Sequence, residues 1–185
     1  QGYAASDKVG AQGVSAGGLL VGAAINMEPG LFRAVHAVVP FVDPLTAGLD
    51  PSAPLTVREW AEWGNPLEDD EVYDYIRSYS PYENVREEEY PAVLATASFN
   101  DSRVSYAEAA KWVARLRERT TNGDDRPILL RTEMDAGHLG VTGLDSQFDA
   151  AAFRLAWLMA QLDPERARPG AWAVSGGEGR DADAR

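Results

Sequence analysis

Short runs of β-branched and other apolar residues alternate along the chain with longer stretches in which apolar residues recur at helical spacing. The short runs predict strands over residues 8–12, 34–39, 91–97 and 128–132. The longer stretches predict helices over residues 19–26, 106–119 and 148–162. Strands that alternate with helices are typical of the α/β class, in which a mostly parallel sheet is flanked by helices. Catalytic groups in such sheets gather beyond the carboxyl ends of the strands.

Two of the helices have a predicted inward face. In the helix over 106–119 this face consists of Ala109, Ala110, Val113 and Leu116. In the helix over 148–162 it consists of Phe148, Ala152, Leu155, Ala156 and Met159. Residues 41–90 are rich in proline, aromatic residues and acid, and there we expect long loops that carry short helices. We expect one domain over residues 1–163 and a disordered tail over residues 164–185.

Composition and charge exclude several classes of function. The chain has 17 basic and 29 acidic residues, a net charge of −12, and no basic cluster, so nucleic acid is not an expected partner. The longest apolar stretch, residues 19–25, is too short to cross a bilayer, so we expect no membrane partner and a location in the cytoplasm or periplasm. Because there is no cysteine, disulfides, thiolate catalysis and cysteine-bound zinc are excluded.

A G-x-S-x-G pattern at residues 13–17 lies between the first predicted strand and the first predicted helix. This is the context of a nucleophile elbow, in which a serine occupies a strained strand-to-helix turn. The positions two before and two after the serine must be small for strand and helix to approach, and here both are glycine. Ser15 is therefore a candidate nucleophile. An ordinary tight turn before a helix is the alternative interpretation.

A serine hydroxyl needs a base to remove its proton, and the chain has two histidines. His36 lies within a predicted apolar strand and is interpreted as a histidine of the core or sheet face. His138 follows the last predicted strand and is the candidate base. Asp101 follows the strand over 91–97 and is the candidate acid that orients the imidazole; its alternative role is an Asx turn or a helix cap. The order serine, aspartate, histidine is that of α/β-hydrolases.

Several motifs in order resemble the catalytic domain of the prolyl oligopeptidase family of serine peptidases, in particular its branch that cleaves after basic residues. They lie at residues 13–20, 40–43, 62–66, 79–85, 100–104, 110–114 and 134–138. The resemblance runs from residue 7 to residue 162. It implies the C-terminal part of an α/β-hydrolase fold, with the upstream strands and a β-propeller absent from these residues. It also implies that Ser15 is the nucleophile, His138 the general base and then acid, and Asp101 its orienting carboxylate.

The same resemblance implies hydrolysis of short peptides on the carboxyl side of arginine or lysine, through an acyl-enzyme and without metal or other cofactor. A buried guanidinium must be paired with a carboxylate, and residues 59–89 hold 11 acidic residues against two arginines. Most of these acids are expected to form a solvated surface. Glu59 matches the family's primary-pocket glutamate, whereas a further acid often found two positions later is Ala61 here. Arg103 matches an arginine that binds a substrate carbonyl; an ion pair with a nearby acid is the alternative.

The resemblance also assigns the oxyanion hole, which needs two hydrogen-bond donors. The backbone N–H of Ala16 supplies one, and the family's second donor lies in an upstream segment outside these residues. We therefore expect the isolated 185 residues to fold poorly and to hydrolyse little. Two other functions stay open: a related peptidase or esterase of the same fold with another pocket preference, and a non-catalytic remnant that binds partners through its acidic, aromatic surface over residues 60–90. The sequence leaves the oligomeric state open.

Overall fold

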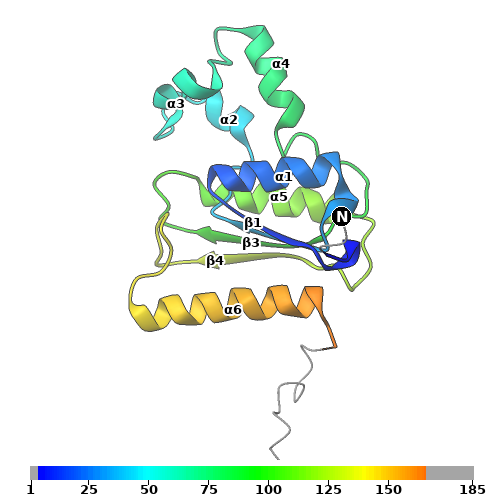
Figure 1. Cartoon of the computed structure of the whole chain (residues 1–185). Coiled ribbons are helices and arrows are strands. Elements are labelled where there is room, and N and C mark those ends of the chain that lie inside the picture. Colours follow the sequence, from blue (N-terminus) through cyan, green and yellow to red (C-terminus); the bar gives the residue numbers. More distant parts are fainter. Residues whose placement is uncertain (1–3, 166–185) are drawn as a thin grey trace, which may run out of the picture.

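A computed structural model describes residues 4–165 of the chain, and it contains one four-stranded sheet (Figure 1). The strands lie in the order of the sequence, and every pairing is parallel. They are β1 (Gly10–Val14), β2 (Ala34–Val38), β3 (Ala92–Ser98) and β4 (Ile128–Glu133). The predicted α/β class with a parallel sheet is confirmed. The expected tail over 164–185 lies, from residue 166 on, outside the described residues.

Helices cover both faces of the sheet. Helices α1 (Ala16–Met27) and α5 (Tyr106–Arg119) lie on one face, and α6 (Leu144–Leu162) lies on the other (Figure 1). A strand that is covered on both faces has no polar side, which explains the continuous apolar runs of the two central strands, β2 and β3. The β1 strand lies at an edge of the sheet, and near it the side chains of Val14 and Leu20 are exposed.

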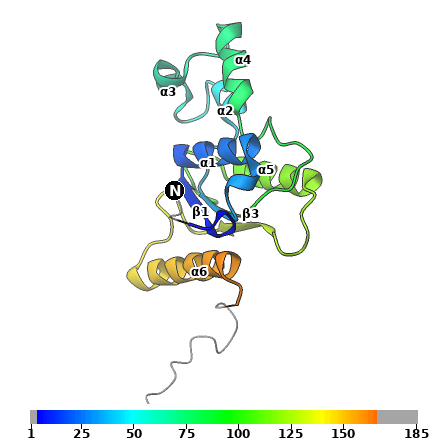
Figure 2. The ribbon, with the colours of Figure 1, turned by 45° about the vertical axis from the view of Figure 1, so that its right-hand side comes forward.

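Residues 41–90 include an excursion, residues 44–79, that lies beyond the layer of α1 and α5 (Figure 2). It carries three helices, α2 (Pro44–Gly48), α3 (Thr56–Trp63) and α4 (Asp70–Tyr79). Aspartates begin two of them: Asp43 accepts a hydrogen bond from the backbone N–H of Thr46, and Asp69 accepts from those of Glu71 and Val72. The prediction of loops with short helices is confirmed here. Two short 3-10 helices, Ser6–Lys8 and Pro29–Leu31, complete the described elements.

The core lies between the sheet and the layer of α1 and α5. Its fully buried members include Trp112 and Leu116 of α5, Ile25 of α1 and Tyr90 before β3. The predicted inward face of α5 is largely confirmed, because Ala109, Val113 and Leu116 are buried, whereas Ala110 is only half-buried. Trp112, rather than Ala110, is fully buried on this side of the helix.

Two predicted boundaries were wrong. The first strand occupies Gly10–Val14 rather than 8–12, because its register against β2 pairs Gly10 with Ala34 and Val14 with Val38. The last helix begins at Leu144 rather than at residue 148.

The predicted inward face of α6 was also wrong. Phe148 is 62% exposed and Leu155 is 54% exposed, and Ala152, Ala156 and Met159 are exposed as well. The half-buried residues of this helix, such as Ala151, Arg154 and Trp157, lie on another side. Because α6 is apolar on several sides, spacing alone does not select the side that meets the sheet.

Candidate active site

Ser15 occupies the turn between β1 and α1 with backbone angles φ 54° and ψ −119°. A non-glycine residue at positive φ is strained by about 1–3 kcal/mol and persists only where its surroundings hold it. Here the N–H of Ser15 donates to the carbonyl oxygen of Val38, at 2.9 Å. The carbonyl oxygen of Ser15 accepts from the N–H groups of Gly18, at 2.8 Å, and Phe41, at 3.0 Å. The neighbouring strand and loop thus hold the serine in this conformation.

The glycines around Ser15 differ in how closely other atoms approach them. A Cβ atom on Gly13 would lie 2.0 Å from the carbonyl oxygen of Gly17, and one on Gly18 would lie 2.5 Å from the Cα of Pro40. A Cβ atom on Gly17 would meet nothing within 4 Å. The prediction that Gly17 must be small for strand and helix to approach was wrong. Strand and helix approach closely at Gly13, and the helix approaches the following loop at Gly18.

His138 and Asp101 are hydrogen-bonded across the carboxyl edge of the sheet. Nδ1 of His138 lies 2.8 Å from Oδ2 of Asp101, and both side chains are largely buried. Asp101 follows β3, and His138 lies in a loop after β4 that a hydrogen bond from Gly140 to Gly137 closes. Because a carboxylate only accepts hydrogen bonds, Nδ1 must carry the proton in this pair. Nε2 of the neutral ring is then free to accept one.

The other oxygen of Asp101 holds the local backbone. Oδ1 accepts from the N–H of Arg103, at 2.8 Å, and from the N–H of Val104, at 3.0 Å. This is the Asx-type turn that was the alternative interpretation of Asp101. The two roles coexist, because each uses a different carboxylate oxygen.

Ser15 and His138 line one cavity, which we call the serine cavity, and Arg103 lines it as well. Ala16 is the first residue of α1, where the backbone N–H groups have no partner within the helix. Such groups carry partial positive charge and are suited to a developing negative charge. The structure therefore brings Ser15, Ala16, Asp101 and His138 to one edge of the sheet.

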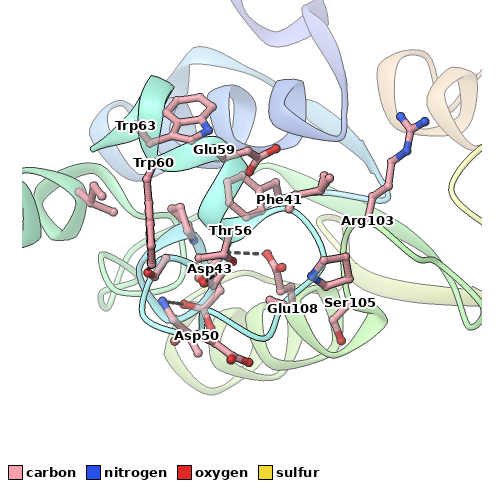
Figure 3. Close-up of a pocket in the computed structure, with 18 of the residues that line it drawn as sticks. Phe41, Asp43, Asp50, Thr56, Glu59, Trp60, Trp63, Arg103, Ser105 and Glu108 are labelled. Carbon is pink, nitrogen blue, oxygen red and sulfur yellow. Dashed lines mark hydrogen bonds between the residues drawn. The ribbon is translucent and has the colours of Figure 1, made fainter. Parts of the chain in front are cut away.

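A second cavity lies between the excursion and α5 (Figure 3). Its lining includes Phe41, Glu59, Trp63, Arg103 and Glu108, and we call it the acidic cavity. Arg103 lines both cavities, so the two adjoin at this residue. Arg103 makes no ion pair with any residue of the part of the chain described, which argues against the alternative interpretation of this side chain.

Helix α3 presents Glu59 to the acidic cavity. Two hydrogen bonds tie this helix to α2: Trp60 Nε1 donates to the carbonyl oxygen of Gly48 at 3.1 Å, and the Thr56 hydroxyl donates to that of Ala47 at 2.8 Å. Burial raises the pKa of Glu59, and the neighbouring charge of Glu62 raises it further. Both effects disfavour the negative charge, so a bound cation would interact strongly with it.

A polar cluster that was not predicted from the sequence lies on the opposite side of the acidic cavity. Glu108 of α5 accepts hydrogen bonds from the backbone N–H groups of Val42 and Asp43, each at 3.0 Å. Lys111, one turn further along α5, forms an ion pair with Asp43. The signal in the sequence was a glutamate next to Ala109, at the start of the apolar stripe that continues with Trp112.

His36 is buried in β2, as the sequence predicted. Its Nε2 lies 3.2 Å from the hydroxyl oxygen of Thr96, and its Nδ1 lies 3.3 Å from Oε1 of Gln12. Burial, together with the charge of Arg154, lowers the pKa of His36 to about 4. The ring is therefore neutral near pH 7 and belongs to the structure of the sheet.

Two further observations concern residues 4–165 alone. They contain no group of three histidine or acidic side chains placed to hold a metal ion. No helix among them combines the length and the apolar character that a membrane crossing requires.

Proteins of known family are similar to this chain in sequence. The model of the prolyl oligopeptidase family matches residues 1–165. Among curated proteins, the chain is 48% identical over 162 residues to dipeptidyl aminopeptidase BI of Pseudoxanthomonas mexicana, covering 88% of this chain and 22% of the relative. It is 46% identical over 165 residues to Protease 2 of Moraxella lacunata, covering 89% of this chain and 24% of the relative.

Solved structures are similar to this chain in both sequence and fold. Oligopeptidase B from Leishmania major superposes with a TM-score of 0.82 at 44% identity, over 85% of this chain and 21% of that protein. The closed form of oligopeptidase B from Trypanosoma brucei, with covalently bound antipain, superposes with a TM-score of 0.83 at 42% identity, over 87% and 22%. These likenesses confirm the resemblance drawn from the motifs and the expected match to part of an α/β-hydrolase fold. The chain spans about a quarter or less of the length of these relatives.

Proposed function

Because this chain belongs to the prolyl oligopeptidase family, we propose that it carries the catalytic residues of a serine peptidase of oligopeptidase B type. Its substrates are short peptides, cleaved on the carboxyl side of arginine or lysine. One observation carries the proposal: the serine cavity, lined by Ser15 and His138, adjoins at Arg103 the acidic cavity that contains Glu59. A peptide could thus present its scissile bond to the serine and the preceding side chain to the glutamate.

The first half of the reaction forms an acyl-enzyme. Oγ of Ser15 attacks the carbonyl carbon while Nε2 of His138 takes the hydroxyl proton. Asp101 holds the ring through Nδ1 and stabilises its positive charge. The backbone N–H of Ala16 donates to the negative oxygen of the tetrahedral intermediate. His138 then gives its proton to the leaving nitrogen, the C–N bond breaks, and the acyl group remains on Ser15 as an ester.

The second half uses water and returns the enzyme to its starting state. The water oxygen attacks the ester carbon while His138 takes one of its protons. The bond to Oγ then breaks, His138 returns the proton to Ser15, and the carboxylic acid leaves. Every atom and proton is accounted for by peptide, water, Ser15 and His138, so no metal or cofactor enters any step.

Specificity follows from Glu59 and Arg103. A guanidinium or ammonium group in the acidic cavity would pair with the carboxylate of Glu59, whose charge is disfavoured without such a partner. Arg103 extends to the boundary of the two cavities, where its guanidinium can donate to a substrate backbone carbonyl. The similarity to Protease 2 and to oligopeptidase B of two organisms supports this assignment.

An arginine-bearing phosphonate that reacts only with an activated serine tests the nucleophile. We expect one adduct per chain by intact mass in the natural-length protein that contains these residues. The adduct should be absent in Ser15→Ala and form much more slowly in His138→Gln. Equal labelling of Ser15→Ala would contradict the proposal, and so would a folded wild-type protein that takes up no label, which is what a non-catalytic remnant predicts.

The Glu59→Gln variant tests the basic specificity. Removing one partner of a buried ion pair should cost about 2–5 kcal/mol in kcat/KM for an arginine substrate. An isosteric citrulline substrate, which is neutral, should be affected little. Glu68→Gln is the matched control, because Glu68 is an exposed acid that does not line the acidic cavity. An unchanged preference for arginine in Glu59→Gln would exclude this role.

The similarity to a dipeptidyl aminopeptidase favours a second candidate, a related peptidase that removes dipeptides from a free N-terminus. Three substrates with the same arginine separate the candidates: an amide with a blocked N-terminus, a dipeptidyl amide with a free N-terminus, and a simple ester. Cleavage of both amides after arginine supports the oligopeptidase. Cleavage of the amide with the free N-terminus alone supports the aminopeptidase, and preference for the ester supports an esterase.

A further inference from the structure

Glu108 places a carboxylate oxygen at the acidic cavity that no protein group satisfies. The residue is only 8% exposed, and it lines this cavity from α5. Its Oε2 accepts the two backbone hydrogen bonds from Val42 and Asp43. Its Oε1 makes no hydrogen bond within residues 4–165, yet it is not among the atoms sealed from solvent. Oε1 is therefore open to the cavity.

Within residues 4–165 Glu108 forms no ion pair. The charge of Lys111 lowers the pKa of Glu108, but the Nζ of Lys111 is paired with Asp43. The backbone hydrogen bonds to Oε2 replace only part of the lost hydration, so the buried negative charge remains costly. Such a group is expected where a ligand supplies the missing charge.

Glu108 and Glu59 line the same cavity from different elements. In Figure 3 the carboxyl group of Glu108 points upward from α5, that of Glu59 lies above it on α3, and the ring of Phe41 stands beside both. A guanidinium has five donors in one plane and can bind two carboxylates from different directions. Phe41 and Trp63 provide the apolar walls that the aliphatic part of such a side chain needs.

We propose that Glu108 is a second specificity determinant of this cavity, which binds together with Glu59 the positively charged side chain of the substrate residue that precedes the scissile bond. This inference rests on the function proposed above. It assigns to α5 the second carboxylate that α3 does not supply, since Ala61 stands two positions after Glu59.

The protonation of Glu108 makes the inference measurable. Burial raises the pKa of Glu108 to about 7 and the charge of Asp43 adds to this, although the backbone hydrogen bonds and the charge of Lys111 oppose it. Glu108 therefore becomes negatively charged as the pH rises through 7. Preference for arginine over neutral citrulline should rise in the same range. Taking this preference as a ratio of two kcat/KM values removes the protonation of His138, which affects both substrates alike.

The other titratable groups that line the cavity keep their charge in this range or are tested separately. Hydrogen bonds from Ser52 lower the pKa of Asp50, and burial raises the pKa of Tyr79. Burial lowers the pKa of Lys111, but the hydrogen bond and the charge of Asp43, together with the charges of Tyr82 and Glu108, raise it on balance. Arg103 is always charged. Glu59 is controlled by its own glutamine variant.

The experiment measures the ratio of kcat/KM for an arginine and a citrulline substrate in the natural-length protein, from about pH 6 to about pH 8. We expect the wild-type ratio to rise about tenfold across this range, the size of one hydrogen bond between charged groups. In Glu108→Gln the ratio should be about tenfold lower at about pH 8 and no longer depend on pH. Glutamine keeps an oxygen for the two backbone N–H groups. Glu118→Gln is the matched control, because Glu118 is an exposed glutamate of the same helix that does not line the acidic cavity.

Each outcome separates this inference from the function on which it rests. A ratio that falls in Glu59→Gln but is unchanged in Glu108→Gln would overturn the role of Glu108 and leave the proposed function standing. A wild-type ratio that is high and flat with pH and is also unchanged in Glu108→Gln would overturn it, whereas a flat ratio that falls in Glu108→Gln would support the role for a carboxylate that stays ionised. A wild-type ratio near one would overturn both. If Glu108 only held the backbone of the 42–43 turn, both substrates would be affected equally.

Discussion

Asp101 uses its two carboxylate oxygens for different purposes: Oδ2 lies 2.8 Å from Nδ1 of His138, and Oδ1 accepts hydrogen bonds from the backbone just after it. The same side chain thus orients the imidazole and shapes the loop that carries Arg103. A carboxylate that is hydrogen-bonded to the imidazole and also forms a turn has little freedom to move, which favours a pre-formed site.

Asp101→Asn separates these two purposes. The amide oxygen can still accept from the backbone, but the NH2 group or a poorly placed oxygen faces Nδ1, so the ring adopts the wrong tautomer. We expect kcat to fall about 10⁴-fold, as in other serine peptidases, with little change in the urea midpoint. Asp135→Asn, an exposed carboxylate three residues before His138, should leave kcat unchanged. Full activity of Asp101→Asn would remove Asp101 from the mechanism.

The glycines of the elbow allow a paired prediction on stability. Gly18→Ala should lower the free energy of unfolding by about 1–3 kcal/mol, because its Cβ would lie 2.5 Å from the Cα of Pro40. Gly17→Ala should be neutral or stabilising by up to about 1 kcal/mol, since its Cβ meets nothing and alanine favours the helix. Urea unfolding of both variants checks this. Equal destabilisation would show that the turn tolerates no side chain at either position.

His36 should make the protein sensitive to acid. Its pKa is about 4 in the folded state and 6.5 in the unfolded state. The unfolded state therefore binds more protons below 6.5, and the stability contributed by the neutral ring is lost as the pH falls from 6.5 through 4. The shift corresponds to about 3 kcal/mol. In His36→Gln the loss of stability between these pH values should be smaller by this amount, as urea unfolding at each pH would show.

Ionisation of Glu108 should lower the free energy of unfolding as the pH rises, even when no substrate is present. Its pKa is about 7 in the folded state against 4.5 in the unfolded state. Its contribution to stability is complete below 4.5 and is lost as the pH rises through 7, by about 3 kcal/mol. Glu108→Gln does not ionise, so its urea midpoint should depend less on pH between these values. The same pH dependence in wild type and variant would show that Glu108 does not ionise there.

The features of this protein that follow a local pattern could be predicted from its sequence. The apolar runs of β2 and β3 indicate cover on both faces, and the G-x-S-x-G pattern indicates a strand-to-helix turn. Asp101 and His138 each follow a predicted strand, and parallel strands end at the same edge of a sheet, so their meeting could be predicted. His36, inside an apolar strand, was recognisable as a buried residue for the same reason.

Which helix faces and which charged groups are buried depends on contacts between residues far apart in the sequence. The apolar sides of α6 are alike in sequence, and contact with the sheet selects one of them, leaving Phe148 exposed. Gly18 is required by Pro40, and Glu108 is buried because the backbone at Val42, 66 residues earlier, meets its carboxylate. Spacing along the chain sets which side chains share a face, but the cost of burying a charge or a Cβ atom depends on the distant atoms around it.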